Sequence, residues 1–233
     1  MVHGAGGGAW EWLIWQRVFE AAGTQTHALH LVPNGALAAT HYTHYLAQVQ
    51  SQIASFQPGV LIGASLGGLL AAEAASYALR SNSAEQPSGQ TCSIRALVLA
   101  APMLKFGVSG TEIALPVKRW AHAPELAKTA RALPDADSAA IAFAHARWRD
   151  ESASVLNSAY AGRNFTHAKL ATLMLIAEND RDVPNAGLRA WANAEQMDVQ
   201  CVRGASHAGL LLGRSAALTA ELAHRWAVAA CLT

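Results

Sequence analysis

Short apolar runs recur along the chain and are separated by longer stretches with helical patterns. The apolar runs, which have the length of buried strands, are 26–32, 59–63, 94–100, 170–176 and 198–202. The stretches that we expect to be helices, from their apolar spacing and their stop signals, are 9–22, 40–56, 66–80, 186–194 and 215–230. This alternation predicts an α/β fold with a mostly parallel sheet covered by helices on both faces.

Three regions depart from this alternation. Only Met1-Val2 precedes the first loop as the stub of a strand, so we expect the N-terminal strands to be minimal or truncated. The polar stretch 81–93 is expected to be a surface loop. Between about residues 102 and 169 the helical pattern is patchy and is interrupted by prolines. We interpret this last segment as a lid of short helices, inserted into a single domain that spans residues 1–233.

A sharp turn is predicted at Gly63-Ala64-Ser65-Leu66-Gly67, between an apolar run and an alanine- and leucine-rich stretch. This is the G-x-S-x-G arrangement, in which a strand turns abruptly into a helix with a serine at the apex. Small residues two positions before and after the serine avoid a collision, and the strained turn holds the hydroxyl above the sheet. Ser65 is therefore the candidate nucleophile.

Two later loops contain the residue types that a serine nucleophile needs. A serine hydroxyl reacts only when a base removes its proton, and that base needs an acid to orient it. The loop after 170–176 contains Asp180 and Asp182, and the loop after 198–202 contains His207. Serine, aspartate and histidine follow one another along the chain in the order expected of enzymes built around a G-x-S-x-G turn.

Together these motifs resemble the α/β-hydrolase superfamily of carboxylesterases and lipases. The matching pieces are spread over most of the chain and are His3-Gly4-Ala5, Gly63 to Gly67, Asp180 to Pro184 and Ser206-His207-Ala208. Residues 3–12 are similar to plant methylesterases and hydroxynitrile lyases, whereas residues 99–104 are similar to the lysophospholipase and monoglyceride lipase group. The resemblance implies the α/β-hydrolase fold, a mostly parallel sheet flanked by helices with a helical lid insertion.

The resemblance also implies a catalytic triad. Ser65, Asp180 and His207 would be its nucleophile, acid and base. The acid loop of the family usually reads G-x-x-D-x-x-V-P, and here Ala177 replaces the first glycine. Counting along this pattern selects Asp180 as the acid and leaves Asp182 as the alternative.

An oxyanion hole and a substrate pocket are expected around these residues. Two backbone N–H groups, those of Ala5 and Leu66, would stabilise the oxyanion, and such a donor typically contributes about 3–4 kcal/mol. The residues expected to line the substrate pocket are Gly4, Trp10, Trp120 and Trp148.

The expected reaction is cleavage of a small-molecule carboxylic ester through an acyl-enzyme intermediate, without a cofactor or metal. One alternative is a lysophospholipase or monoglyceride lipase activity. Another is carbon–carbon cleavage, as in hydroxynitrile lyases, but those enzymes have a lysine after the histidine and a threonine in the oxyanion loop. This chain has Ala208 and Gly4-Ala5 there. A non-catalytic receptor for a small ligand is the third alternative.

Composition excludes several other classes. The chain of 233 residues has a net charge of +1 and no basic or acidic block, which argues against nucleic acid and anionic membrane partners. Charged residues and glycines interrupt every apolar stretch before the roughly 18 residues of a membrane span. Cys92, Cys201 and Cys231 are far apart, as in the reduced thiols of an intracellular protein. We therefore expect a cytoplasmic protein, and the sequence leaves its oligomeric state open.

Two further ligand classes are disfavoured. The loop Gly4-x-Gly6-x-x-Ala9 weakly matches a dinucleotide-binding pattern, but the following stretch 26–31 lacks the acidic residue that would bind the ribose. His27 and His30 would face opposite sides of a strand and cannot share a metal ion. No metal site is expected.

Overall fold

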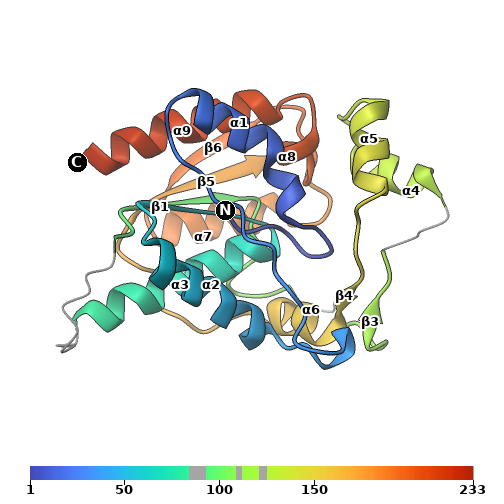
Figure 1. Ribbon diagram of the computed structural model, residues 1–233, viewed down its shortest axis with the longest axis horizontal. Helices are drawn as coiled ribbons and strands as arrows, with labels where there is room; N and C mark the ends of the chain where they lie inside the picture. Colours follow the sequence, from blue (N-terminus) through green and yellow to red (C-terminus); the bar gives the residue numbers. More distant parts are fainter. Residues whose placement is uncertain (84–92, 109–111, 121–124, 233) are drawn as a thin grey trace.

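The computed structural model describes residues 1–83, 93–108, 112–120 and 125–232 (Figure 1). Its central sheet has four parallel strands in the order β1-β2-β5-β6. These strands are β1 (Val60–Ala64), β2 (Ala96–Ala100), β5 (Ala171–Ala177) and β6 (Asp198–Val202). All four lie within one or two residues of the strands predicted from the apolar runs, and the predicted parallel sheet is confirmed.

Helices cover both faces of the sheet because successive strand residues point to opposite sides. In β2, Leu97 and Leu99 belong to one buried cluster, whereas Val98 and Ala100 belong to the other. The first cluster is completed by α2 (Tyr42–Phe56), α3 (Leu66–Ser83) and α7 (Asn185–Ala194). The second is completed by α1 (Leu13–Ala21), α8 (Gly209–Leu212) and α9 (Ala216–Leu232). Figure 1 shows these two sets of helices on opposite sides of the sheet.

Ahead of β1, the β-bridges within the described residues all involve Val2. Its N–H and C=O bond to backbone groups of β1 at 2.8 and 3.0 Å, so this residue extends the sheet beside β1. On its other side Val2 pairs only with Leu29. The strand predicted over 26–32 is therefore wrong. One reason is that the amide of Leu31 donates to the imidazole of His3, at 3.0 Å, instead of to another strand.

The segment between β2 and β5 corresponds to the predicted insertion of about residues 102–169, and we refer to it as the inserted segment. Its elements are β3 (Val117–Lys118), α4 (Leu126–Ala132), α5 (Ser138–His145), β4 (Glu151–Ser152) and α6 (Ala153–Tyr160). Helices α4 and α5 lie beside the end of the sheet where the strands terminate (Figure 1). The pair β3 and β4 forms a small antiparallel sheet that the sequence did not predict, because two-residue strands have no readable period.

The inserted segment is joined to the core by an ion pair whose carboxylate is buried. Arg163, just after α6, donates two hydrogen bonds of 3.0 and 3.1 Å to Glu73 of α3. The Glu73 side chain is 1% exposed, so the pairing compensates a charge that would otherwise be buried alone.

Helix α3 continues to Ser83, so the first three residues of the loop predicted over 81–93 are helical. Most of the remaining residues of that predicted loop lie outside the described residues.

Within the described part of the chain, no helix is both long enough and apolar enough to cross a membrane. Cys201 and Cys231 are free thiols. Cys92 lies outside the described residues.

The turn from β1 into α3 predicts unequal effects for two glycine substitutions. A Cβ at Gly63 would lie 2.3 Å from the carbonyl oxygen of Gly67, whereas a Cβ at Gly59 would meet open space. We expect Gly63→Ala to lower the free energy of unfolding by about 2 kcal/mol or more, and Gly59→Ala to change it by less than about 1 kcal/mol. Urea denaturation measures both values. Equal losses would contradict the close approach of the two backbones.

Candidate active site

Ser65 lies directly after β1, at the edge of the sheet where all four strands end. Its φ of 50° is in the left-handed region, which costs a residue other than glycine about 1–3 kcal/mol. Its N–H donates to the Ala100 carbonyl at 3.0 Å, and its own carbonyl accepts from Gly68 and Met103, both at 3.0 Å. These bonds hold the strained turn, and the sharp strand-to-helix turn predicted from G-x-S-x-G is present.

The glycine-rich loop after Val2 lies against this turn. A Cβ on Gly4 would lie 3.2 Å from the Cβ of Ser65, and one on Gly67 would lie 2.3 Å from the carbonyl oxygens of Val2 and His3. Two backbones approach so closely only where side chains are missing. The loop therefore forms one wall of the space around the Ser65 hydroxyl.

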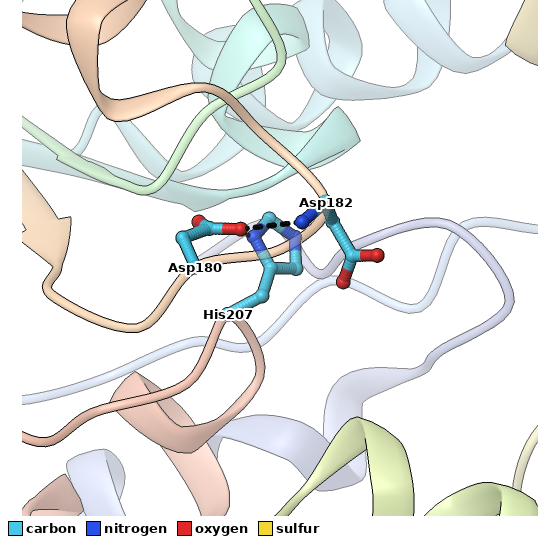
Figure 2. A group of neighbouring side chains, drawn as sticks. All are labelled: Asp180, Asp182 and His207. Atoms are coloured by element: carbon cyan, nitrogen blue, oxygen red, sulfur yellow. Dashed lines mark hydrogen bonds and ion pairs between the residues drawn. The ribbon is translucent and has the colours of Figure 1, made fainter.

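The carboxylate of Asp180 binds the imidazole of His207. Figure 2 shows this contact, in which His207 Nδ1 lies 2.8 Å from Asp180 Oδ2. The other oxygen, Oδ1, accepts the amides of Asp182 and Val183 at 2.8 and 2.9 Å. The Asp180 side chain is fully buried, so its orientation is determined by these contacts.

The charges around His207 favour its protonated form. Burial by itself lowers the pKa of this imidazole. The hydrogen bond and negative charge of Asp180 act in the opposite direction, and so do the carboxylates of Asp182 and Glu11. Together they outweigh burial and raise the pKa of His207 above its ordinary value.

Asp182 is exposed and makes no hydrogen bond to His207 among the described residues. Ligand atoms of Asp180, Asp182 and His207 lie within 4.8 Å of one another, a spacing compatible with a metal ion. However, Asp180 already uses Oδ1 for two amides and Oδ2 for the imidazole. The positions of the Asp180 and His207 side chains are thus explained by these hydrogen bonds without a metal ion.

Two cavities meet at Ser65 and His207. The smaller, about 70 Å³, is also lined by Gly4, Ala5, Glu11, Ala64, Ala100, Trp148, Ala208 and Leu210 to Leu212. The larger, about 620 Å³, extends under the inserted segment and is also lined by Ala5, Met103, Arg119, Trp120, Lys128, Thr129, Ala132, Trp148, Leu156, Tyr160, Asp182, Val183 and Ala208. Both cavities are bounded mainly by apolar side chains, as ligand pockets commonly are.

The residues expected to line the substrate pocket take different positions. Gly4, Trp120 and Trp148 line one or both cavities. Trp10 lines neither, and its ring packs edge-on against Trp148 and Phe143 of the inserted segment, with centroids 5.2 and 5.7 Å apart.

The Ser65 hydroxyl and the two predicted oxyanion-hole amides have no hydrogen-bond partner among the described residues. The structure therefore brings Ser65 and His207 to the same cavities without a direct bond. The two amides are those of Ala5 and Leu66.

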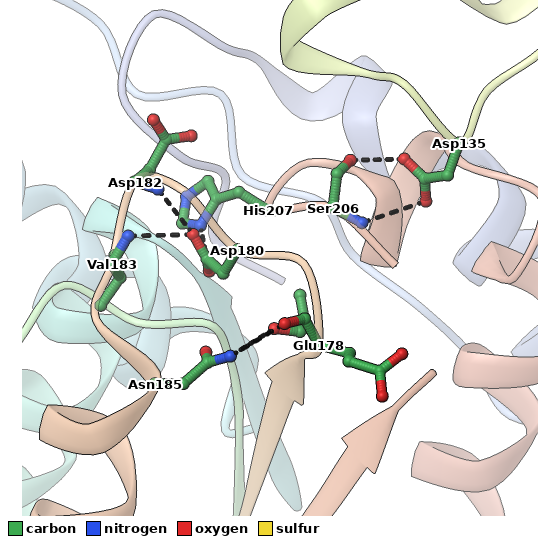
Figure 3. Close-up of polar contacts among 9 residues, drawn as sticks. Asp135, Glu178, Asp180, Asp182, Val183, Asn185, Ser206 and His207 are labelled. Atoms are coloured by element: carbon green, nitrogen blue, oxygen red, sulfur yellow. Dashed lines mark hydrogen bonds and ion pairs between the residues drawn. The ribbon is translucent and has the colours of Figure 1, made fainter. Parts of the chain in front are cut away.

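Sequence reasoning missed several polar residues around the site. Asp135 of the inserted segment accepts hydrogen bonds from the Ser206 hydroxyl and amide, immediately before His207 (Figure 3). Glu178 accepts the amide of Gly204 at 2.8 Å and so links the loops after β5 and β6. Buried Glu11 lies beside the glycine loop. These partners are distant in sequence or occur in no motif, although an acid between two tryptophans was a visible signal for Glu11.

Comparisons with known proteins agree with this architecture. A family model described as the alpha/beta hydrolase family matches residues 1–222. None of the curated proteins matches the chain.

Several solved structures superpose on nearly the whole chain. Tomato methylketone synthase I complexed with 2-tridecanone has a TM-score of 0.68 at 17% identity, over 95% of this chain and 94% of that chain. A methylesterase from Arabidopsis has a TM-score of 0.68 at 13% identity, over 96% and 97%. A pyrethroid hydrolase from Sphingobium faniae has a TM-score of 0.65 at 18% identity, over 98% and 96%. At these identities the likeness concerns the fold. Since the family model covers nearly every residue, from the glycine loop to α9, the chain belongs to the alpha/beta hydrolase family.

Proposed function

We propose that this protein is a serine hydrolase that cleaves carboxylic esters with Ser65, His207 and Asp180. The observation that carries the proposal is the Asp180–His207 hydrogen bond of 2.8 Å, next to a serine that occupies a left-handed turn and lines the same cavities. A buried carboxylate on Nδ1 leaves Nε2 of the imidazole available as the base. The alpha/beta hydrolase family and the esterases among the similar structures support this chemistry.

The reaction would proceed in two steps. Ser65 Oγ attacks the ester carbonyl while His207 takes the hydroxyl proton, and the leaving alcohol then receives that proton as the carbon–oxygen bond breaks. Water, deprotonated by His207, hydrolyses the acyl-enzyme and releases the acid and the free serine. The amides of Ala5 and Leu66, which have no acceptor among the described residues, would donate to the oxyanion. In this reaction the inserted segment would act as a lid.

Substitution of the nucleophile tests the proposal directly. We expect Ser65→Ala to lower kcat for short p-nitrophenyl esters by a factor of about 10⁴ or more, because no other group would form the acyl-enzyme. Ser55→Ala, which removes an exposed hydroxyl on α2, is the matched control and should leave kcat unchanged. Thermal unfolding verifies that both variants fold. Equal rates for wild type and Ser65→Ala would refute the assignment.

A pair of carboxamide variants distinguishes the two candidate acids. Asp180→Asn should lower kcat by about 10³–10⁴, since a neutral amide no longer holds the imidazole tautomer or stabilises its protonated form. Asp182→Asn, in the same loop but without a bond to His207, should change kcat by less than about tenfold. Steady-state kinetics on one ester compares them. A larger loss in Asp182→Asn would assign the acid role to that residue.

The larger cavity predicts a preference for medium acyl chains. Its volume of about 620 Å³ lies within the usual range for pockets that enclose small organic ligands. We expect kcat/KM to increase from acetyl to octanoyl esters and to fall for palmitoyl esters. Trp120→Ala should alter this profile, whereas Trp226→Ala, which lines neither of these cavities, should not. A maximum at palmitoyl would favour the lipase alternative, and cyanide release from mandelonitrile without ester turnover would favour the lyase.

A further inference from the structure

The backbone of the loop Gly4–Gly8 is held mostly by groups that come from outside the loop. From the inserted segment, the backbone amide of Arg149 donates to the Gly6 carbonyl at 2.7 Å, and its Nε donates to the Gly7 carbonyl at 2.6 Å. The carboxylate of Glu151 accepts the Gly6 amide at 3.2 Å. The loop therefore depends for its shape on contacts from outside it, two of them from side chains, since no regular secondary structure determines it.

Glu11 holds the opposite side of this loop. It lies in the 3-10 helix η1 (Ala9–Trp12), is 5% exposed, and accepts the Gly4 amide at 3.1 Å through Oε2. Its carboxylate fits against Gly7 so closely that a Cβ there would lie 2.0 Å from Oε1. Glu11 also lines the smaller cavity together with Ser65 and His207. None of the reaction steps proposed above uses this side chain.

Only one amide between Gly4 and Gly7 has no acceptor among the described residues. Gly4 donates to Glu11, Gly6 donates to Glu151, and Gly7 donates to the Gly4 carbonyl at 3.3 Å. The remaining amide is that of Ala5, which lines both cavities. Because Glu11 accepts the Gly4 amide, the Ala5 amide is the one that remains free to face a substrate.

We propose that Glu11 is a positioning residue, which holds the glycine loop through the Gly4 amide so that the Ala5 amide faces the carbonyl attacked by Ser65. This inference rests on the proposed esterase function. Without Glu11, a buried amide would lose its acceptor, and the loop would shift to find another partner. Such a shift would displace an oxyanion donor without removing any group that reacts.

The charge of Glu11 also affects the pKa of His207, which gives a second measurable consequence. Burial raises the pKa of Glu11 to about 7, although the Gly4 hydrogen bond and the positive charges of His207 and Arg149 act in the opposite direction. In return, ionised Glu11 raises the pKa of His207, in addition to the larger effect of Asp180 and that of Asp182. Removing this charge should therefore lower the pKa of His207. Activity that requires the neutral imidazole would then appear at lower pH.

Two substitutions separate the hydrogen bond from the charge. Glu11→Gln keeps an oxygen that can accept the Gly4 amide, so we expect kcat within about threefold of wild type and an acid limb of the kcat/KM profile shifted to lower pH. Glu11→Ala removes the acceptor, and we expect kcat to fall about tenfold to hundredfold while KM changes less than threefold. Glu20→Gln, on the exposed end of α1, is the control and should match wild type in kcat and pH profile.

NMR titration of His207 in Ser65→Ala, with and without Glu11→Gln, measures the charge effect independently of turnover. A lower pKa of the imidazole in the double variant supports the inference, and an unchanged pKa overturns the electrostatic part. Equal losses of kcat in Glu11→Gln and Glu11→Ala would overturn the positioning role. If Glu11→Ala does not fold, the comparison of Glu11→Gln with wild type decides: an unchanged acid limb refutes the inference. Retained activity in Ser65→Ala would instead refute the esterase function itself.

Discussion

The contact between two backbones at the end of β1 is the constraint on which the rest of the site depends. Gly67, at the start of α3, lies so close to the carbonyl groups of Val2 and His3 that there is no room for a side chain at this position. Val2 is itself bonded to β1 on both its N–H and its C=O. The glycine loop therefore begins at a fixed point beside Ser65, although only an isolated β-bridge precedes it within the described residues.

From this fixed point, polar side chains rather than regular structure shape the loop. Glu11 holds it from the side of the small cavity, and Arg149 and Glu151 hold it from the inserted segment. Glu151 is 1% exposed and also accepts the Tyr45 hydroxyl of α2 at 3.0 Å. A buried charge of this kind is stable only when its hydrogen bonds are satisfied. The inserted segment and the loop consequently support each other's conformation.

The inserted segment also reaches the histidine. Asp135 binds Ser206, and Cβ atoms on Gly209 or Gly213 would collide with its carboxylate, so the turn that carries His207 packs closely on this aspartate. The same segment thus contacts two of the three loops that surround Ser65, and it provides Trp120 and Trp148 to the cavities. The shape of the pocket and the positions of both loops therefore depend on how this segment packs against them.

The parallel sheet, its helical cover, the turn at Ser65 and the loops that contain Asp180 and His207 could all be predicted from the amino-acid sequence. These features follow from local periodicity and from short motifs, because a buried strand or a sharp turn needs particular residues next to one another. The strand expected over 26–32 is absent because a strand also needs a partner that is distant in sequence. Its apolar pattern was suitable, but its amides found side-chain partners such as His3 instead of a neighbouring strand.

The sequence pattern favoured Asp180 over Asp182, but the contact of its carboxylate with the imidazole and the groups that hold the glycine loop are visible only in the folded chain. Asp180 and Asp182 have the same side chain and lie in the same loop. They differ in exposure because the backbone turns the Asp180 side chain into a buried position and leaves Asp182 exposed. Asp135, Glu151 and Arg149 lie far along the chain from the loops they bind. Such contacts leave no local pattern in a single sequence, since they arise only when the inserted segment packs over the edge of the sheet.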